Sequence, residues 1–332
     1  MRTVIIGLGT VSRTHRKALA LMDDVELVAV ADVKPEKKEE LPEGVHFYED
    51  YKEMLDKEKP DAAHICLPHY LHLEAATECA KRGINILCEK PSNMNGEQLR
   101  QMQKLEDQYQ VKLAICFQNR LNPTFVKLQE MIGSGEYGKL LGIKAVAIWS
   151  RDMNYYQASP WRASMAQAGG GCMINQAIHT LDLLLYFAGK PVSVRGKVST
   201  DELYDTIEVE DTAHGLIRFE NGLKANFYCT NTFGIDRPVE IELVFEKAIL
   251  KTDAETLYLN KDGRITTLCT SAASGAKAYW GTGHEILIRD FYRAVEENRP
   301  FWIDGQSALP VLKLLKGVYQ SSKEDGREVS LL

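Results

Sequence analysis

The chain has 332 residues, of which 45% are hydrophobic and 26% charged, and its formal net charge is −6. This is an ordinary globular composition with enough apolar side chain for a full core, and the length favours two domains. No basic block occurs, which argues against nucleic acid as a partner. The first apolar run is too short for a signal peptide, and no stretch approaches the ~18 apolar residues of a transmembrane helix. The seven cysteines include no CxxC pair, so neither a zinc site nor a redox pair is indicated. We expect a soluble, cytoplasmic protein with free thiols.

The first 120 residues alternate strand and helix signals. Strands are expected at residues 2–7, 26–32, 62–67, 85–88 and 112–116. Amphipathic helices are expected between them, for example at residues 73–82 and 96–110. Strands that alternate with helices predict an α/β domain, residues 1–120, with a doubly wound parallel sheet.

The remainder, residues 121–332, has a different pattern. Strand signals occur at residues 142–150, 192–200, 213–219, 223–230, 238–251, 256–260 and 265–269. Asn221-Gly222 predicts a type I′ hairpin, and Asp262-Gly263 predicts another turn. Helices are expected at residues 171–188, 285–298 and 308–322. These signals predict an α+β domain with a large open, mainly antiparallel sheet.

A glycine motif follows the first expected strand and opens a helix. It reads Gly7-Leu8-Gly9-Thr10-Val11-Ser12, which is GxGxxG with serine at the last position. Such a turn lets a pyrophosphate approach the backbone at a helix N-terminus. Asp32 ends the second strand, where an acid binds the adenosine ribose hydroxyls and disfavours a 2′-phosphate. The pattern predicts NAD rather than NADP, although Asp32 could also simply cap a turn.

Lys90 belongs to Cys88-Glu89-Lys90-Pro91, which closes the strand expected at residues 85–88. In open α/β sheets, ligands bind beyond the carboxyl ends of the strands. Lys90 is therefore a candidate for the nicotinamide end of the site. The alternative is a surface lysine at a strand–loop junction.

The most informative stretch is residues 169–182, where a triple glycine precedes an apolar helix. Asn175, His179 and Asp182 are spaced i, i+4 and i+7, so they share one narrow stripe of that helix. Buried polar groups need partners, so the stripe indicates a cleft or a polar network. The alternative is a core histidine hydrogen-bonded to Asp182.

The ordered set of motifs resembles the Gfo/Idh/MocA oxidoreductase family, which includes glucose–fructose oxidoreductase and inositol 2-dehydrogenase. The motifs are GxGxxGxxH from Gly7 to His15, Pro68-His69-Tyr70-Leu71-His72, Glu89-Lys90-Pro91, Asn119-Arg120-x-x-Pro123, Trp161-Arg162 and GGG-x(6)-H-x-x-D. The resemblance implies a Rossmann domain, an open-faced antiparallel sheet, an NAD(P) cofactor and a polyol-like substrate between the domains.

The resemblance also implies site residues. Lys90 would hydrogen-bond the reacting hydroxyl, and His179 would match the catalytic histidine; which of them is the base stays open. Asn175 stands where the family usually has aspartate, and it can only orient the substrate or Lys90. Leu67-Pro68-His69 replaces the usual Thr-Pro-Asn. The expected cofactor-binding residues are Gly7, Gly9, Thr10, Val11, Asp32, Leu67, Pro68, His69, His72, Glu89, Lys90 and Gln118. The expected substrate-binding residues are Lys90, Arg120, Tyr156, Trp161, Arg162, Asn175 and His179.

These features predict an NAD(H)-dependent oxidoreductase that acts on a secondary hydroxyl or keto carbon of a sugar, sugar derivative or cyclitol. A lining arginine would suit a carboxylate or phosphate, so a nucleotide-sugar uronate stays open. No metal ion is expected, because the Lys90 cation supplies the charge. His15, His72 and His284 are expected to cap helices or fill structural roles rather than to take part in the chemistry.

Two alternative functions stay open, and the sequence also indicates an oligomer. One alternative is an NAD-binding sensor of the same family, against which the retention of Lys90 and His179 argues. The other is a trans-dihydrodiol dehydrogenase-like reductase. An open sheet exposes a face at residues 213–219 and 238–245, so a homodimer or homotetramer is expected.

Overall fold

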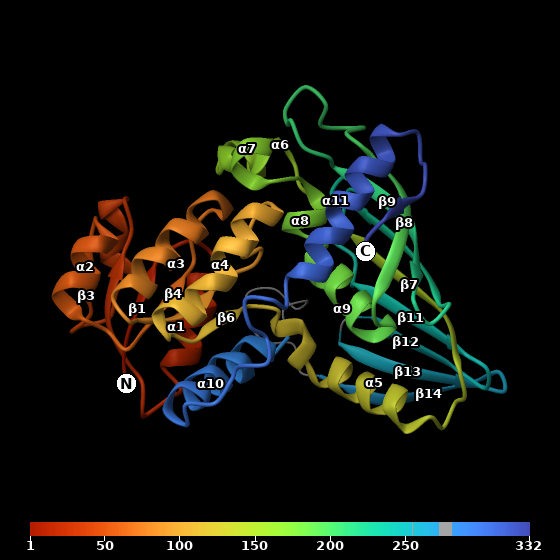
Figure 1. Cartoon of the computed structure of the whole chain (residues 1–332), viewed down its shortest axis with the longest axis horizontal. Helices are drawn as coiled ribbons and strands as arrows, with labels where there is room; N and C mark the ends of the chain where they lie inside the picture. Colours follow the sequence, from red (N-terminus) through yellow and green to blue (C-terminus); the bar gives the residue numbers. More distant parts are fainter. Residues whose placement is uncertain (254, 272–280) are drawn as a thin grey trace. The chain divides into compact units, whose positions relative to one another are not determined.

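The computed structural model describes residues 1–253, 255–271 and 281–332. They form two compact units (Figure 1). The first unit comprises Met1–Gln118 and His284–Ala308, and the second comprises Asn119–Gly283 and Leu309–Leu332. The domain boundary predicted from the sequence, between residues 120 and 121, placed residues 284–308 in the second domain, whereas they belong to the first unit. Backbone pairing holds this segment there, since the Ile115 N–H donates to the Ile303 carbonyl and Ala114 forms a β-bridge with Asp304.

The first unit is built on a six-stranded parallel sheet in the order β3-β2-β1-β4-β5-β6, which confirms the predicted Rossmann-type fold. The strands are β1 Arg2–Ile6, β2 Glu26–Ala31, β3 His46–Tyr48, β4 Ala62–Ile65, β5 Asn85–Cys88 and β6 Leu113–Ile115. The helices are α1 Ser12–Leu19, α2 Tyr51–Glu58, α3 His72–Lys81, α4 Gly96–Tyr109 and α10 Gly283–Glu296, with short 3₁₀ turns at η1 Pro35–Glu40 and η2 His69–Leu71. A third 3₁₀ turn, η3 Gln118–Leu121, starts at the last residue of the Met1–Gln118 segment and continues into the second unit.

The strand β3 was not predicted from the sequence, whereas α2 is one of the helices expected between the strands. β3 has only three residues and lies at the sheet edge, where none of its residues is fully buried. By contrast, every residue of β4 is buried, because neighbouring layers cover both faces of a central parallel strand. The carboxyl ends of the central strands β1, β4 and β5 carry the glycine motif, Leu67-Pro68-His69 and Lys90.

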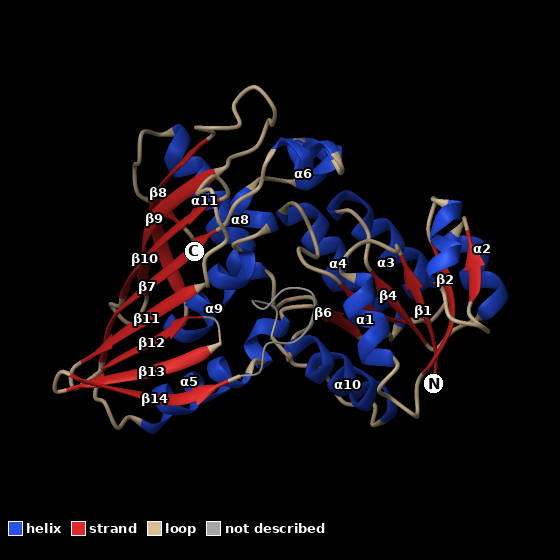
Figure 2. Ribbon diagram, turned by 180° about the vertical axis from the view of Figure 1, so that it is seen from behind, coloured by secondary structure: helices blue, strands red, loops and turns tan. Residues whose placement is uncertain are grey.

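The second unit contains a nine-stranded sheet in the order β14-β13-β12-β11-β7-β10-β9-β8-β15 (Figure 2). All neighbours are antiparallel except β7 and β10, which confirms the mainly antiparallel sheet. The strands are β7 Leu140–Ile148, β8 Pro191–Ser199, β9 Thr212–Phe219, β10 Lys224–Thr230, β11 Glu240–Phe245, β12 Ile249–Asp253, β13 Thr256–Lys261, β14 Arg264–Thr270 and β15 Val329–Ser330. The single strand expected at residues 238–251 was wrong, because a turn closed by the Phe245 N–H and the Ala248 carbonyl divides it.

The two predicted turns differ in type. Asp262 and Gly263 both have positive φ, 52° and 77°, as a type I′ hairpin requires. At the hairpin between β9 and β10, only Gly222 has a left-handed backbone conformation, and its N–H donates to the Phe219 carbonyl. The hairpin is confirmed but its type was wrong, because the turn starts at Phe219 and the Asn221 amide is used to bond the Ala188 carbonyl.

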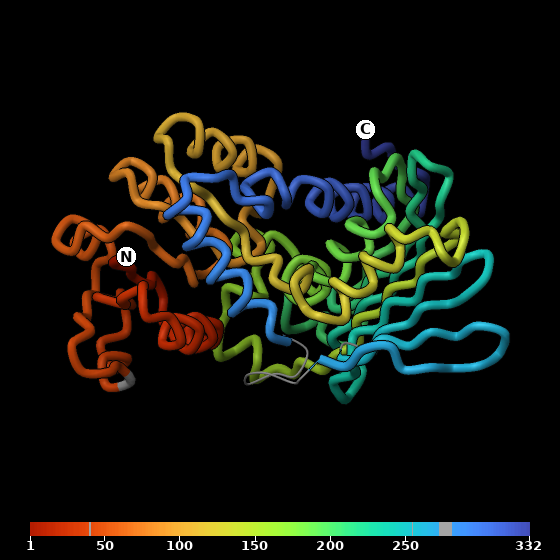
Figure 3. The backbone as a smooth tube through the Cα atoms, turned by 90° about the horizontal axis from the view of Figure 1, so that it is seen from below, coloured from red at the N-terminus to blue at the C-terminus, as the bar shows by residue number. Residues whose placement is uncertain are grey.

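One face of the nine-stranded sheet is covered by α5, α9 and α11 (Figure 2), and α11 runs beside β8 (Figure 3). The helices are α5 Pro123–Ser134, α6 Met153–Gln157, α7 Met165–Ala168, α8 Cys172–Asn175, α9 Ile178–Ala188 and α11 Leu309–Lys323, with the 3₁₀ turn η4 Pro160–Ala163. Throughout the described ranges, no helix combines the length and apolarity needed to cross a membrane.

The helix expected over residues 171–188 is interrupted, so the prediction of one continuous helix was wrong. The N–H groups of Gln176 and Ala177 both donate to the Cys172 carbonyl. The bond from Ala177 spans five residues, which widens the turn, and the regular ladder restarts at Ile178. Asn175 therefore ends α8, while His179 and Asp182 lie on the buried helix α9.

Candidate functional site

The glycine turn after β1 has the geometry that its sequence predicts. Gly7 has a φ of +95°, and a Cβ there would lie 2.6 Å from the Cys66 carbonyl oxygen. Only glycine fits such a position without strain. The buried Ser12 hydroxyl donates to the Gly9 carbonyl at 2.7 Å, so the third motif position tolerates this small polar residue. Helix α1 begins at Ser12, and its first N–H groups face the end where an anion is favoured.

Asp32 ties this turn to the end of β2. Its two carboxylate oxygens accept hydrogen bonds from the backbone N–H groups of Leu8, at 2.7 Å, and Lys34, at 3.0 Å. The turn-capping interpretation therefore holds. It does not compete with ribose recognition, because each oxygen has a second lone pair available.

His72 connects the loops that follow β4 and β5. Its Nε2 lies 2.7 Å from the Leu67 carbonyl oxygen and its Nδ1 lies 2.8 Å from the Pro91 carbonyl oxygen. Burial lowers the pKa of His72, although the two carbonyls oppose this shift. His72 thus holds the loop containing Pro68 against the segment of Lys90, whose peptide bond to Pro91 is cis.

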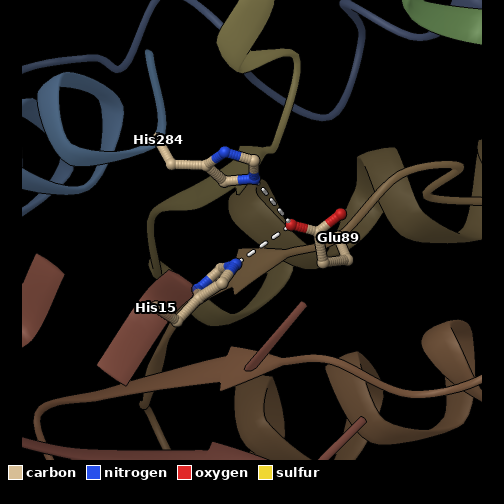
Figure 4. Close-up of side chains that lie close together, drawn as sticks. All are labelled: His15, Glu89 and His284. Carbon is tan, nitrogen blue, oxygen red and sulfur yellow. Dashed lines mark hydrogen bonds and ion pairs between the residues drawn. The ribbon is translucent and has the colours of Figure 1, made fainter. Parts of the chain in front are cut away.

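Glu89 is buried, and its carboxylate faces two histidines (Figure 4). Its Oε1 lies 3.0 Å from Nε2 of His15 and 3.6 Å from Nε2 of His284, while Oε2 accepts the backbone N–H of Lys90 at 3.3 Å. Burial would raise the pKa of Glu89, but the hydrogen bond from His15 and the nearby ring of His284 hold it well below its usual value. The three side chains offer ligand atoms within 4.8 Å of one another, a spacing that could suit a metal ion.

In the second unit, Arg120 forms a two-pronged ion pair with the buried Asp182. The guanidinium donates to both carboxylate oxygens, at 2.8 and 2.6 Å, and stacks 5.1 Å from the Tyr186 ring centroid. Burial raises the pKa of Asp182 although Arg120 opposes the rise. Both carboxylate oxygens of Asp182 are thus paired with Arg120, whereas the alternative raised from the sequence was a core His179 hydrogen-bonded to Asp182.

The residues around Asn175 form an amide and phenol network. The Tyr155 hydroxyl accepts from Gln176 at 3.0 Å and from Asn175 at 3.5 Å. Asn231 donates to the Tyr156 hydroxyl at 3.2 Å and to the Gln176 side-chain oxygen at 3.1 Å. The sequence reading missed Gln176 and Asn231. Gln176 could have been found from its place beside Asn175, but nothing in the sequence singled out Asn231.

Two arginines flank Tyr155. Arg162 lies 5.0 Å from the Tyr155 ring centroid and 4.7 Å from that of Trp161. Arg151, also missed, lies 5.5 Å from the same Tyr155 ring and pairs with Asp236 at 2.8 Å. The second unit therefore presents cationic and aromatic groups beside the amide of Asn175.

Glu210 anchors the segment that carries Asn175. This buried carboxylate accepts the backbone N–H groups of Gly171, at 2.8 Å, and Met173, at 3.0 Å, and the Tyr319 hydroxyl at 2.5 Å. Burial raises the pKa of Glu210 although these donors oppose the rise. Glu210 and Tyr319 come from distant parts of the chain, so no local sequence signal could have identified them.

The predicted catalytic groups are distributed over both units. Lys90 is the second residue after β5 in the first unit and is half-buried. His179 is the second residue of α9 in the second unit and is buried.

Comparison with known proteins identifies both units. Residues 1–117 match a model described as an oxidoreductase family with an NAD-binding Rossmann fold, and residues 125–251 match the GFO/IDH/MocA C-terminal domain. The cofactor of the first unit is therefore NAD.

Among curated relatives, myo-inositol 2-dehydrogenase of Thermotoga maritima is 30% identical over 67% of this chain and 66% of its own length. D-glucoside 3-dehydrogenase of Escherichia coli is 26% identical over 100% of this chain and 97% of its own. Among solved structures, the WlbA dehydrogenase of Bordetella pertussis with NADH and UDP-GlcNAcA has a TM-score of 0.86 at 27% identity, covering 100% of this chain and 99% of that one. Levoglucosan dehydrogenase with NADH and levoglucosan has a TM-score of 0.87 at 20% identity, covering 100% and 99%, and supports the fold alone.

Proposed function

Because the chain belongs to the Gfo/Idh/MocA family of oxidoreductases, we propose that it is an NAD-dependent dehydrogenase acting on a secondary hydroxyl carbon of a sugar, sugar derivative or cyclitol. The observation that carries the proposal is Lys90, which follows β5 at the carboxyl edge of the parallel sheet that bears the dinucleotide turn. This edge is where open α/β sheets bind their ligands. The curated relatives named after inositol and glucosides support the substrate class.

The residues that would hold NAD lie around this edge. The amide groups at the start of α1 suit the pyrophosphate, and the carboxylate of Asp32 suits the adenosine ribose while disfavouring a 2′-phosphate. His72 would act indirectly, by holding the loops that line the cofactor. Glu89 would likewise act through the backbone of Lys90. The full proposed set is Gly7, Gly9, Thr10, Val11, Asp32, Leu67, Pro68, His69, His72, Glu89, Lys90 and Gln118.

The proposed chemistry needs one proton to leave the substrate hydroxyl. NAD+, when bound, accepts the hydride. His179 would take the hydroxyl proton, since an imidazole has an ordinary pKa of ~6.5, near working pH. The Lys90 ammonium would stabilise the developing alkoxide. Asn175 cannot accept a proton and would orient the hydroxyl through its amide.

A sugar acid is the second candidate substrate, and Arg162 beside Tyr155 favours it. Arg162 stacks on this ring, whose hydroxyl bonds the Asn175 and Gln176 amides. Arg151 stacks on the same ring but is already paired with Asp236. Guanidinium groups suit carboxylates and phosphates. The WlbA relative was solved with UDP-GlcNAcA. Arg120, which is engaged by Asp182, would shape the substrate side rather than bind an anion. The substrate side would comprise Lys90, Arg120, Tyr156, Trp161, Arg162, Asn175 and His179.

We also propose a homodimer or homotetramer formed through the uncovered face of the nine-stranded sheet, where the side chain of Tyr228 is 39% exposed. Closed symmetry is the usual way to cover such a face. The seven cysteines are all free thiols, which supports a reducing compartment such as the cytoplasm.

The test is a panel of polyols, sugars, sugar acids and nucleotide sugars with NAD+ and NADP+ in parallel. We expect NADH formation with at least one secondary alcohol and weaker use of NADP+. A complete lack of turnover, with NAD still bound, would favour the alternative of an NAD-dependent sensor. Turnover only with cyclic dihydrodiols would favour the reductase alternative.

A further inference from the structure

Buried hydrogen-bonding groups form a continuous row through the first unit, from β1 to the end of β5. All of them are at most 5% exposed. Starting from the Ala62 carbonyl, the row consists of Thr3, Tyr292, His64, His15 and Glu89. The successive distances are 3.1, 2.5, 2.9, 2.8 and 3.0 Å. The direction of each hydrogen bond can be worked out from the two ends.

At the first end, the Ala62 carbonyl can only accept, so the Thr3 hydroxyl uses its one hydrogen there. The Tyr292 hydroxyl must then donate to the Thr3 oxygen. Because that hydrogen is used, the Tyr292 oxygen accepts from His64, which must carry a hydrogen on Nε2. The carbonyl of one β-strand residue thus fixes the tautomer of a histidine three groups away.

At the other end, burial would favour a neutral Glu89, but its contacts with His15 and His284 hold its pKa well below the usual value, so the carboxylate is ionised and can only accept. Nε2 of His15, 3.0 Å away, must then carry a hydrogen. The Nδ1 atoms of His15 and His64 lie 2.8 Å apart and need one hydrogen between them. The two rings therefore hold three hydrogens on four nitrogens. A pair of neutral imidazoles holds only two, so the pair carries one positive charge.

The charge belongs mainly on His15. Burial opposes it, but contacts with Cys66 and Cys116 and the hydrogen bond to the Glu89 carboxylate raise the pKa of His15 well above its usual value. Burial and the charge on His15 lower the pKa of His64. His284, the other histidine at Glu89, has its pKa lowered by burial.

We propose that His15 and His64 share one permanent positive charge that keeps Glu89 ionised, and that this buried ion pair positions Lys90. The role of Lys90 rests on the proposed function. The connection is direct, because Glu89 Oε2 accepts the backbone N–H of Lys90 while the Glu89 N–H donates to the Ile65 carbonyl on β4. An uncompensated buried charge is strongly destabilising, so loss of either partner would loosen this strand end.

The same arrangement argues against a metal ion between His15, Glu89 and His284. A metal ligand must present a lone pair, whereas the hydrogen count places a hydrogen on Nε2 of His15. Both histidines also point at a single oxygen of Glu89 rather than at a common empty point (Figure 4).

The test is the protonation state of the histidine rings, measured by nitrogen-15 NMR on the full chain from about pH 6 to about pH 9, the range around an ordinary histidine pKa. We expect three protonated nitrogens on the His15–His64 pair throughout. The titratable groups that face the pair, and whose charges must be included, are Cys66, Cys116, Glu89, His284 and Tyr292. A wild-type pair with two hydrogens, or zinc uptake with loss of the hydrogen on His15 Nε2, would overturn the proposal.

Thr3→Val tests the row at its far end. Without the threonine oxygen, the Tyr292 hydroxyl can donate to Nε2 of His64. His64 can then donate from Nδ1, and the pair needs only two hydrogens. We expect the third hydrogen to be lost within the same pH range. Thr252→Val is the matched control, since Thr252 is an equally buried threonine on β12 of the second unit. Unchanged ring protonation in Thr3→Val would overturn the proposal.

Kinetics then test the positioning role. In Thr3→Val, kcat should fall by about tenfold as the pair loses its charge at alkaline pH, because a displaced catalytic group lowers the rate. The kcat of the wild type and of Thr252→Val should not fall at alkaline pH. An unchanged pH profile, despite the lost hydrogen, would refute the role in positioning. Full activity of Lys90→Ala would instead refute the proposed function and leave the charge count intact.

Discussion

Gly171→Ala is the substitution whose effect can be worked out most fully. A Cβ at Gly171 would lie 1.9 Å from the carbonyl oxygen of Glu210 and 2.8 Å from its carbonyl carbon. Both are backbone atoms, so no side-chain rotation can relieve the clash. The Gly171 N–H also donates to the Glu210 carboxylate, at 2.8 Å, in a buried setting.

The magnitude follows from these contacts. Ordinary van der Waals contact begins at 3.4 Å, so the backbone must separate by about 1.5 Å, which exceeds any normal packing adjustment. Overpacking costs about 1–3 kcal/mol, and a weakened hydrogen bond to a charged group costs about 1.5–3 kcal/mol. We expect a loss of roughly 2.5–6 kcal/mol in the free energy of unfolding. The movement is transmitted to α8 and α9, so kcat should fall by about 10²-fold.

Urea denaturation and steady-state kinetics would measure both effects. The matched control is Gly133→Ala in α5, where no atom lies within 4 Å of the new Cβ. This control should be neutral or stabilising by up to about 1 kcal/mol, because alanine favours a helix. If Gly171→Ala is as stable and as active as the control, the close approach to Glu210 does not hold α8 in place.

Three further predictions concern single residues. Asp32→Ser should raise the ratio of kcat/KM for NADP+ to that for NAD+ by at least about tenfold, since it removes the charge that repels a 2′-phosphate; an unchanged ratio would contradict the ribose role. Burial and the nearby Asp304 raise the pKa of Glu106 from 4.5 to about 7, so the stability that Glu106 provides is complete below about pH 4.5 and is lost as pH rises through 7. Glu106→Gln should therefore become more stable relative to wild type by roughly 1–2 kcal/mol between those pH values, allowing for partial exposure, and urea titrations that show a constant difference would contradict this. Arg120→Lys should lower stability by about 1–3 kcal/mol, because an ammonium cannot bond both oxygens of Asp182; a melting temperature equal to that of wild type would contradict this.

The features that depend on short stretches of chain could be predicted from the sequence. The glycine turn, the alternation in the first 120 residues and most strands of the second unit follow from local periodicity and turn residues. The three-residue strand β3 was missed because it is too short to show a period. The break between α8 and α9 was missed because an apolar sequence does not reveal which carbonyl Ala177 will bond.

The supporting residues could not be predicted, because the fold brings them together from distant positions. Glu210 binds the N–H of Gly171, 39 residues away in the sequence, and Tyr319 binds Glu210 from 109 residues away. The Tyr292 hydroxyl binds Thr3, 289 residues away. Sequence motifs identify the groups that do chemistry. The hydrogen bonds that fix their charge and orientation depend on tertiary packing.

The central proposal is that hydride transfer from the substrate alcohol requires both Lys90 and His179. The most direct measurement is the single-turnover rate of deuterium transfer to NAD+ from a substrate deuterated at the carbinol carbon. We expect each of Lys90→Ala and His179→Ala to lower this rate by at least ~10²-fold, the usual scale of acid–base loss, while NAD+ binding is retained. Transfer at near wild-type rates in both variants would contradict the account.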